Sequence, residues 1–100
     1  MPTFKIEYLP VAQKDLIEIL EYIQRDNPPA ALALLNKIDE SIAKLGDFPL
    51  MGAMPKDIRL KSLGYRMLVI GNYLVFYVLM DDIVEIRRIM HGKRRYEFLV

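Results

Sequence analysis

The sequence predicts one α+β domain, with a β-α-α unit followed by a three- to four-strand antiparallel meander. Three observations support this fold class. A short stretch near the N-terminus alternates between apolar and polar residues, two longer segments repeat with helical spacing, and the second half is rich in strand-forming residues. At 100 residues and 53% hydrophobic content, residues 1–100 form one domain with its own core. We expect the helical hairpin to pack on one face of the sheet.

The first predicted strand and helix lie on either side of Pro10. Residues 3–8 place Phe4, Ile6 and Tyr8 on one side, which is typical of a half-buried strand. Pro10 ends this strand and suits the first turn of a helix over residues 11–25. That helix has an inward apolar face formed by Ala12, Leu16, Ile19, Leu20 and Ile23.

A second helix is predicted from residue 28 to about residue 45. Asn27 suits its N-cap and Pro28 its first position, while Gly46 stands where a C′ glycine is expected. Because the break between the helices is so short, they are expected to form an αα-hairpin. We place the acidic residues of both helices on the solvent side, where a solvated face is a simpler interpretation than a partner surface.

The pattern of residues in the second half of the sequence predicts the meander. Residues 47–55 contain two Pro and one Gly and indicate a connecting loop. The predicted strands are residues 58–63 as a short edge strand, then 65–70, 73–80 and 83–91, with turns at Gly71-Asn72 and Asp81-Asp82. Residues 73–80 are apolar on both faces, which favours a central strand.

Composition excludes several classes of function. The chain has no Cys and one His, so a disulfide framework or a thiolate metal site is excluded, and we expect no metal and no cofactor. No apolar run approaches a membrane span and no signal peptide is recognisable, so we expect a cytoplasmic protein. Nucleotide-binding, serine-hydrolase and zinc-protease motifs are absent from the sequence.

Charge is unevenly distributed along the chain. Residues 1–55 carry five basic and eight acidic side chains, whereas residues 56–100 carry nine and five. The asymmetry suggests an anionic partner for the second half, although a solvated sheet edge explains it equally well.

Residues 84–96 are the candidate functional segment. We expect Glu85, Arg87, Ile89 and His91 to face one side of the last strand and Val84, Ile86, Arg88 and Met90 the other. Arginine binds phosphate through a planar fork, and a histidine side chain can pass protons in catalysis. The cluster favours RNA, DNA or an acidic peptide as partner. His91 as a polar rim residue, and the tyrosines as core residues, are the plain alternatives.

The ordered set of motifs resembles the RelE/ParE family of bacterial type II toxin–antitoxin toxins. The resemblance rests on residues 10–23, 26–31, 48–52, 64–66, 72–77 and 84–96. It implies a β-α-α-meander fold and a cognate antitoxin as partner. RelE-like members are ribosome-dependent mRNA endonucleases, whereas ParE-like members inhibit DNA gyrase without known cleavage residues.

The residue pattern of the meander and the resemblance together suggest roles for individual residues in an mRNA endonuclease. Candidate catalytic residues are Arg66, His91, Arg94 and Tyr96, and candidate RNA- or phosphate-binding residues are Arg59, Lys61, Arg87, Lys93 and Arg95. Tyr73 stands where RelE-type nucleases have an arginine, and their glutamate base has no match. We therefore expect an endonuclease acting on ribosome-bound mRNA, with gyrase inhibition as the alternative. A membrane partner is not expected.

Overall fold

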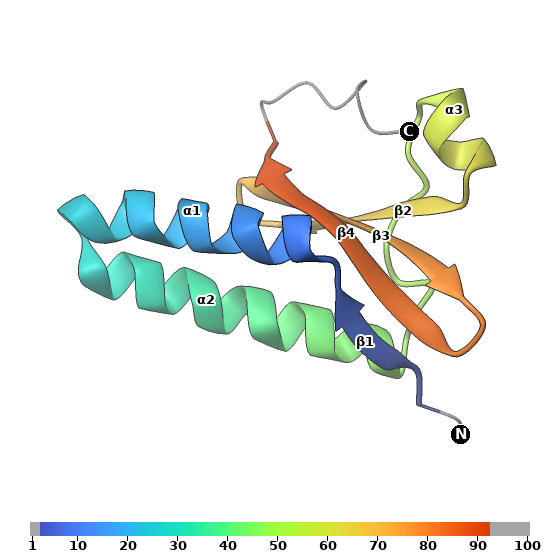
Figure 1. Ribbon diagram of the computed structural model, residues 1–100, viewed down its shortest axis with the longest axis horizontal. Coiled ribbons are helices and arrows are strands. Elements are labelled where there is room, and N and C mark those ends of the chain that lie inside the picture. Colours follow the sequence, from blue (N-terminus) through green and yellow to red (C-terminus); the bar gives the residue numbers. More distant parts are fainter. Residues whose placement is uncertain (1–2, 93–100) are drawn as a thin grey trace.

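The computed structural model describes residues 3–92, which form an α+β domain with one four-stranded sheet (Figure 1). The strand order is β1-β4-β3-β2, so the first and last strands of the chain are neighbours. The predicted fold class and the bounds of the three meander strands are confirmed. The elements are β1 (Lys5–Tyr8), α1 (Pro10–Asp26), α2 (Pro28–Ala43), a 3-10 turn η1 (Lys44–Gly46), α3 (Ile58–Ser62), β2 (Tyr65–Ile70), β3 (Tyr73–Met80) and β4 (Ile83–His91).

The sheet is mixed because β1 runs parallel to β4, whereas β2, β3 and β4 form an antiparallel meander. Lys5 aligns with Ile83 and Tyr8 with Ile86. The long connection that such a parallel pair requires contains the helical hairpin, α3, β2 and β3. One edge of β4 is therefore paired with β1 only as far as Ile86.

Local sequence explains the helix ends. Asn27 ends α1 and caps α2, with its side-chain oxygen accepting from the Ala30 N–H at 3.2 Å, as predicted. Gly46 does not act as a C′ glycine with a positive φ. Instead its carbonyl accepts from Phe4 N–H at 2.8 Å, and an added Cβ would lie 3.2 Å from the Phe4 oxygen. Gly46 thus lets the end of the hairpin pack closely against the N-terminal segment.

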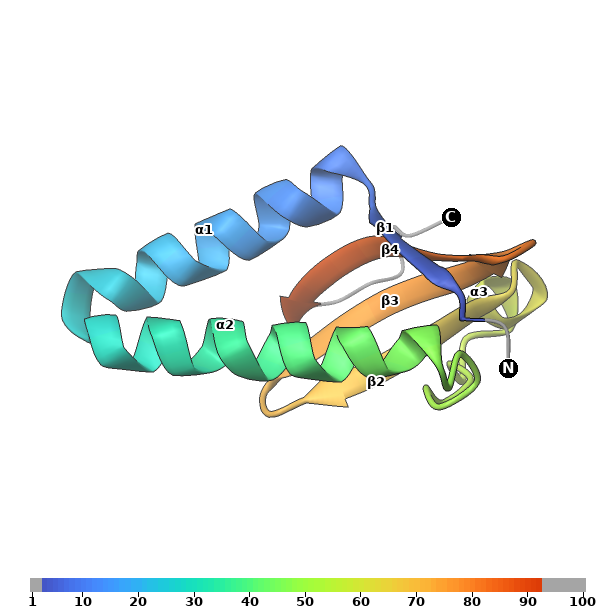
Figure 2. The same cartoon turned by 90° about the horizontal axis from the view of Figure 1, so that it is seen from below.

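The main core lies between the hairpin and one face of the sheet. In Figure 2, α1 and α2 meet at their connecting turn and splay apart towards the sheet. The buried residues of this core are Ala12, Ile38, Ile42, Leu45, Leu68, Ile70, Val75, Tyr77, Val84, Ile86 and Ile89. None of the described helices is long and apolar enough to cross a membrane.

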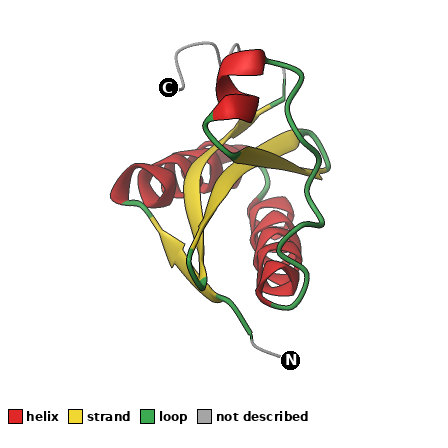
Figure 3. Cartoon of the chain, turned by 90° about the vertical axis from the view of Figure 1, so that its right-hand side faces the viewer, coloured by secondary structure: helices red, strands yellow, loops and turns green. Residues whose placement is uncertain are grey.

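Residues 58–63 do not form the predicted edge strand; most of them belong to α3, which lies apart from the two long helices in Figure 3. Asp57 caps this helix by accepting from the Arg59 N–H at 2.8 Å, and Gly64 follows it with φ +82°. Capping at both ends outweighs the short apolar alternation that suggested a strand. Through Leu60, α3 covers a second cluster on the opposite face, formed with Tyr65, Phe76, Val78 and Met90.

A β-bulge in β4 changes which of its side chains share a face of the sheet, so the predicted alternation fails beyond it. Tyr77 aligns with Ile86 but Phe76 aligns with Arg88, so Arg87 is an extra residue. After the bulge, Ile89 joins the hairpin-side core while Met90 joins the second cluster. The expected grouping of Ile89 with Arg87, and of Met90 with Ile86, is therefore wrong.

Candidate functional site

A pocket of about 430 Å³ opens between α1 and the ends of β3 and β4. We call it the α1–β4 pocket; it is lined by Asp15, Glu18, Ile19, Tyr22, Tyr73, Ile89, Met90 and His91. Its four α1 residues are spaced at i, i+3, i+4 and i+7, which places them on one helical face. The pocket combines carboxylates, aromatic rings and an apolar floor, since Ile89 and Met90 are almost fully buried.

Asp15 joins α1 to the unpaired edge of β4. Its carboxylate accepts two hydrogen bonds from the Arg88 guanidinium, at 2.7 and 3.1 Å, and one from the Ile89 N–H at 3.0 Å. Because β1 pairs with β4 only as far as Ile86, this carboxylate replaces a missing strand partner. The hydrogen bond to Asp15 also raises the pKa of Arg88 above its ordinary value.

His91 lies at the other wall of the pocket, at the end of β4. Its ring packs edge-on against Tyr73, with ring centroids 5.3 Å apart, and the two residues are aligned across β3 and β4. On the α1 side, Tyr22 is 71% exposed and Glu18 is also exposed. Aromatic rings and a solvent-accessible carboxylate thus face a common space.

Arg66 does not line the α1–β4 pocket and instead holds a loop in place. Its guanidinium donates to the carbonyls of Gly52 at 2.8 Å and Leu50 at 3.3 Å. The neighbouring Tyr77 hydroxyl donates to the Pro49 carbonyl at 2.8 Å and accepts from the Gly52 N–H at 2.9 Å. Burial raises the pKa of Tyr77 above its usual value. Both side chains hold the loop before α3 against β2 and β3.

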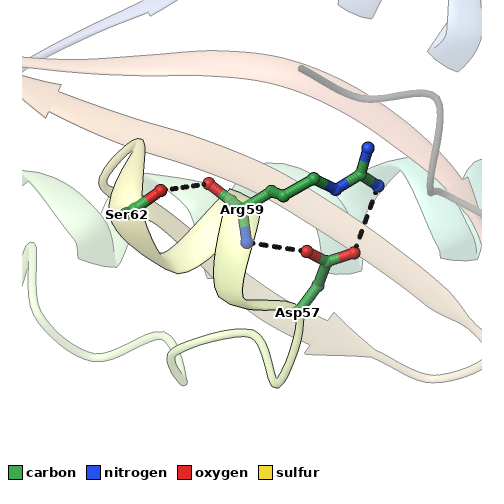
Figure 4. Close-up of polar contacts among 3 residues, drawn as sticks. All are labelled: Asp57, Arg59 and Ser62. Atoms are coloured by element: carbon green, nitrogen blue, oxygen red, sulfur yellow. Dashed lines mark hydrogen bonds and ion pairs between the residues drawn. The ribbon is translucent and has the colours of Figure 1, made fainter.

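Two candidate arginines on the opposite side of the sheet, Arg87 and Arg59, are ion-paired within the protein. Arg87 donates to Glu85 at 2.7 Å, and its guanidinium lies 5.6 Å from the centre of the Tyr65 ring. Arg59 pairs with Asp57 at 3.3 Å on α3 (Figure 4), while Lys61 is exposed on the same helix. Burial lowers the pKa of Arg87, but its interactions with Tyr65 and Glu85 more than offset this, so the pKa lies above its ordinary value.

The candidate residues are not all brought together. Arg66 and His91 align with Tyr77 and Tyr73, four residues apart on β3, which corresponds to about 13 Å along a strand. Arg87 packs against Tyr65, in the second cluster on the other face of the sheet. The other predicted residues, Lys93, Arg94, Arg95 and Tyr96, lie outside the described residues.

Sequence reasoning missed the α1 contribution to the pocket. Asp15 was expected on the solvent side but is ion-paired to Arg88, with only 12% of its side chain exposed. The signal was present in the helical spacing of Asp15, Glu18 and Tyr22. Nothing in the sequence alone indicated that this face would meet the end of the last strand.

The fold is shared with toxins from several toxin–antitoxin systems. One match is titled the chromosomal ParDE TA system from P. aeruginosa, with 20% identity, a TM-score of 0.77, and 93% of this chain and 100% of that chain covered. The RelBE2 complex from Mycobacterium tuberculosis matches at 23% identity and TM-score 0.63, covering 89% and 98% of the two chains. YafQ from E. coli strain BL21(DE3) matches at 21% identity and TM-score 0.59, covering 88% and 92%.

A family model gives the class of the protein, which is a toxin of a type II toxin–antitoxin system. Residues 6–96 match the model of the family described as ParE toxin of type II toxin-antitoxin system, parDE. The chain therefore belongs to the ParE toxin family, which confirms the resemblance drawn from its motifs. Comparison with curated protein sequences gives no match.

Proposed function

We propose that this toxin acts by binding DNA gyrase rather than by cutting mRNA, and that a cognate antitoxin neutralises it. The observation that carries the proposal is the placement of the arginines on the sheet within residues 3–92. Arg66 holds a loop, Arg87 pairs with Glu85, and Arg88 pairs with Asp15. Membership of the ParE family supports gyrase as the target, because ParE-like members are gyrase inhibitors.

Cleavage of a phosphodiester requires several side chains to converge on one phosphate. The candidate residues that the structure describes do not converge in this way. In-line attack needs cations and a proton donor within a few ångströms of one phosphate. Arg66 and His91 are about four strand residues apart, and Arg87 is on the opposite face. A binding inhibitor needs no such convergence, since its affinity comes from surface complementarity.

The deciding experiment compares two reactions with the same purified toxin. The proposal expects inhibition of gyrase supercoiling and intact mRNA on programmed ribosomes. Because binding needs no proton donor, His91→Ala is expected to retain inhibition within about twofold of the wild type. Cut mRNA in the ribosomal A site, with supercoiling unaffected, would refute gyrase binding as the activity.

A ribosome-dependent mRNA endonuclease is the second candidate. His91 is the residue that favours it, because it lies at the end of β4, immediately before Gly92 and the basic run Lys93-Arg94-Arg95. In that case His91 or Tyr96 would act as acid or base, with Arg94 binding the phosphate. Loss of A-site cutting in both His91→Ala and Arg94→Ala is the result expected from this candidate.

The antitoxin partnership is proposed from the solved neighbours. Two of them are titled as complexes, namely RelBE2 and DinJ-YafQ. The latter matches at 17% identity and a TM-score of 0.57. Co-expression of this toxin with the product of an adjacent small open reading frame is expected to restore growth. Toxicity that no co-expressed neighbour relieves would count against the partnership.

A further inference from the structure

We propose that the α1–β4 pocket binds a lysine or arginine side chain of the antitoxin. This inference rests on the proposed antitoxin partnership and adds the chemistry of one contact. The pocket accepts a cation with an apolar stem, flanked by aromatic rings. Its charge, shape and lining each support that occupant.

The charge of the pocket comes from Glu18. The Asp15 carboxylate is already occupied by Arg88 and by the Ile89 N–H, and its ion pair is neutral overall. Glu18, one turn further along α1, forms no ion pair at contact distance within residues 3–92, although its charge also acts on Arg88. The lining that the structure describes thus holds two carboxylates and no Lys or Arg, which attracts a cation and repels phosphate.

The lining of the pocket matches a long basic side chain. Lys and Arg combine an apolar stem with a charged end, and the stem packs well on apolar surface. Ile19 and the buried Ile89 and Met90 provide that surface. The exposed ring of Tyr22 and the ring of Tyr73 offer faces for a cation–π contact. At about 430 Å³, the pocket also has room for an apolar neighbour of the basic residue.

The rigidity of one wall favours a specific contact. Asp15 holds α1 to β4 through three hydrogen bonds, and Glu18 and Tyr22 follow on the same helical face. His91 is packed against Tyr73 on the facing strands. Little ordering is then required when a partner segment binds, so a single charged contact contributes more of its energy to affinity.

The first test uses four synthetic peptides, acetyl-Ala-Leu-X-Leu-Ala-amide, in which X is Arg, Lys, citrulline or Glu. Titration of ¹⁵N-labelled toxin is expected to show Arg and Lys peptides shifting the amides of Glu18, Tyr22 and His91. Citrulline preserves the shape of Arg without its charge, so its peptide is expected to bind at least about tenfold more weakly. Equal affinity of the Arg and citrulline peptides, or shifts confined to other residues, overturns the proposal.

The second test uses Glu18→Gln, with Glu21→Gln as the matched control on the same helix. Glu21 lies outside the α1–β4 pocket, beside Gln24 and Arg25. Glu18→Gln is expected to reduce the affinity for the Arg peptide to that of citrulline, and Glu21→Gln to leave it within about twofold. A Glu18→Gln variant that binds the Arg peptide as tightly as the wild type refutes the cation site.

Failure of this inference is distinguishable from failure of the proposed function. With the co-expressed antitoxin, Glu18→Gln is expected to weaken the complex by about tenfold while leaving gyrase inhibition unchanged. If the toxin inhibits gyrase but binds antitoxin equally well with Glu or Gln at residue 18, only the pocket proposal is refuted. If the toxin has no effect on gyrase but shows the expected peptide selectivity, only gyrase as the proposed target is refuted.

Discussion

Asp15 and Arg88 are 73 residues apart in sequence and form a two-point ion pair that joins α1 to the last strand. The same carboxylate accepts from the Ile89 N–H, where β1 no longer covers the edge of β4. One side chain thus completes the strand edge, orients Arg88 and forms part of the wall of the α1–β4 pocket. The site and the stability of the domain are coupled through this residue.

Replacement of Asp15 by Ala is expected to destabilise the protein by about 2–4 kcal/mol. The change removes the acceptor of the Ile89 N–H and the ion-pair contact between Asp15 and Arg88. Urea unfolding followed by circular dichroism measures the effect. Asp26→Ala at the end of α1 is the control, and a loss below about 0.5 kcal/mol for Asp15→Ala would contradict the assigned role.

The hydroxyl of Tyr77 fixes the loop before α3, so Tyr77→Phe is expected to cost about 1–3 kcal/mol. The ring is fully buried and remains so, but the Gly52 N–H and the Pro49 carbonyl lose their partner. Hydrogen exchange should rise at Gly52 and remain unchanged at the centre of α2. Unchanged protection at Gly52 would show that the hydroxyl does not hold this loop.

The backbone at Gly52 lies so close to Tyr77 that any larger residue at this position is expected to destabilise the fold. A Cβ at this position would lie 2.6 Å from the Tyr77 hydroxyl and 2.8 Å from its ring. Gly52→Ala is therefore expected to destabilise the fold by about 1–3 kcal/mol through overpacking. Combined with Tyr77→Phe the cost should be less than additive, because the closest contact disappears; strict additivity in a double-mutant cycle would exclude this contact as the cause.

The charge of Asp57 is expected to make α3 sensitive to acid. A side-chain hydrogen bond to Arg59, followed by backbone hydrogen bonds, lowers the pKa of Asp57 below its ordinary 3.8. A lowered folded pKa means that the ionised carboxylate stabilises the fold above about pH 4, and that this contribution is lost as the pH falls through the folded value.

Asp57→Asn tests this pH dependence because it keeps a capping oxygen and removes the charge. The difference in unfolding free energy between wild type and variant should be constant near neutral pH and shrink in acid. A carbon-detected NMR titration of the Asp57 carboxyl gives the folded pKa directly. A midpoint above 3.8 would contradict the assigned hydrogen bonds.

Local rules were sufficient for most of the fold. Strands 65–70, 73–80 and 83–91 follow from apolar patterning and from turns at Gly71 and Asp81, both of which have positive φ. Asn27 and Pro28 likewise mark the junction of the helices. The exception is α3, where the capping residues Asp57 and Gly64 outweighed a weak strand pattern.

Local sequence patterns were enough to predict every element except α3, and to indicate the family of this protein. The tertiary structure decided how the functional residues combine. The bulge at Arg87 reverses the faces of the strand beyond it, and the early end of β1 leaves an edge that Asp15 occupies. Both depend on pairing between segments far apart in the chain, which local periodicity does not encode. The α1–β4 pocket therefore becomes visible only in three dimensions.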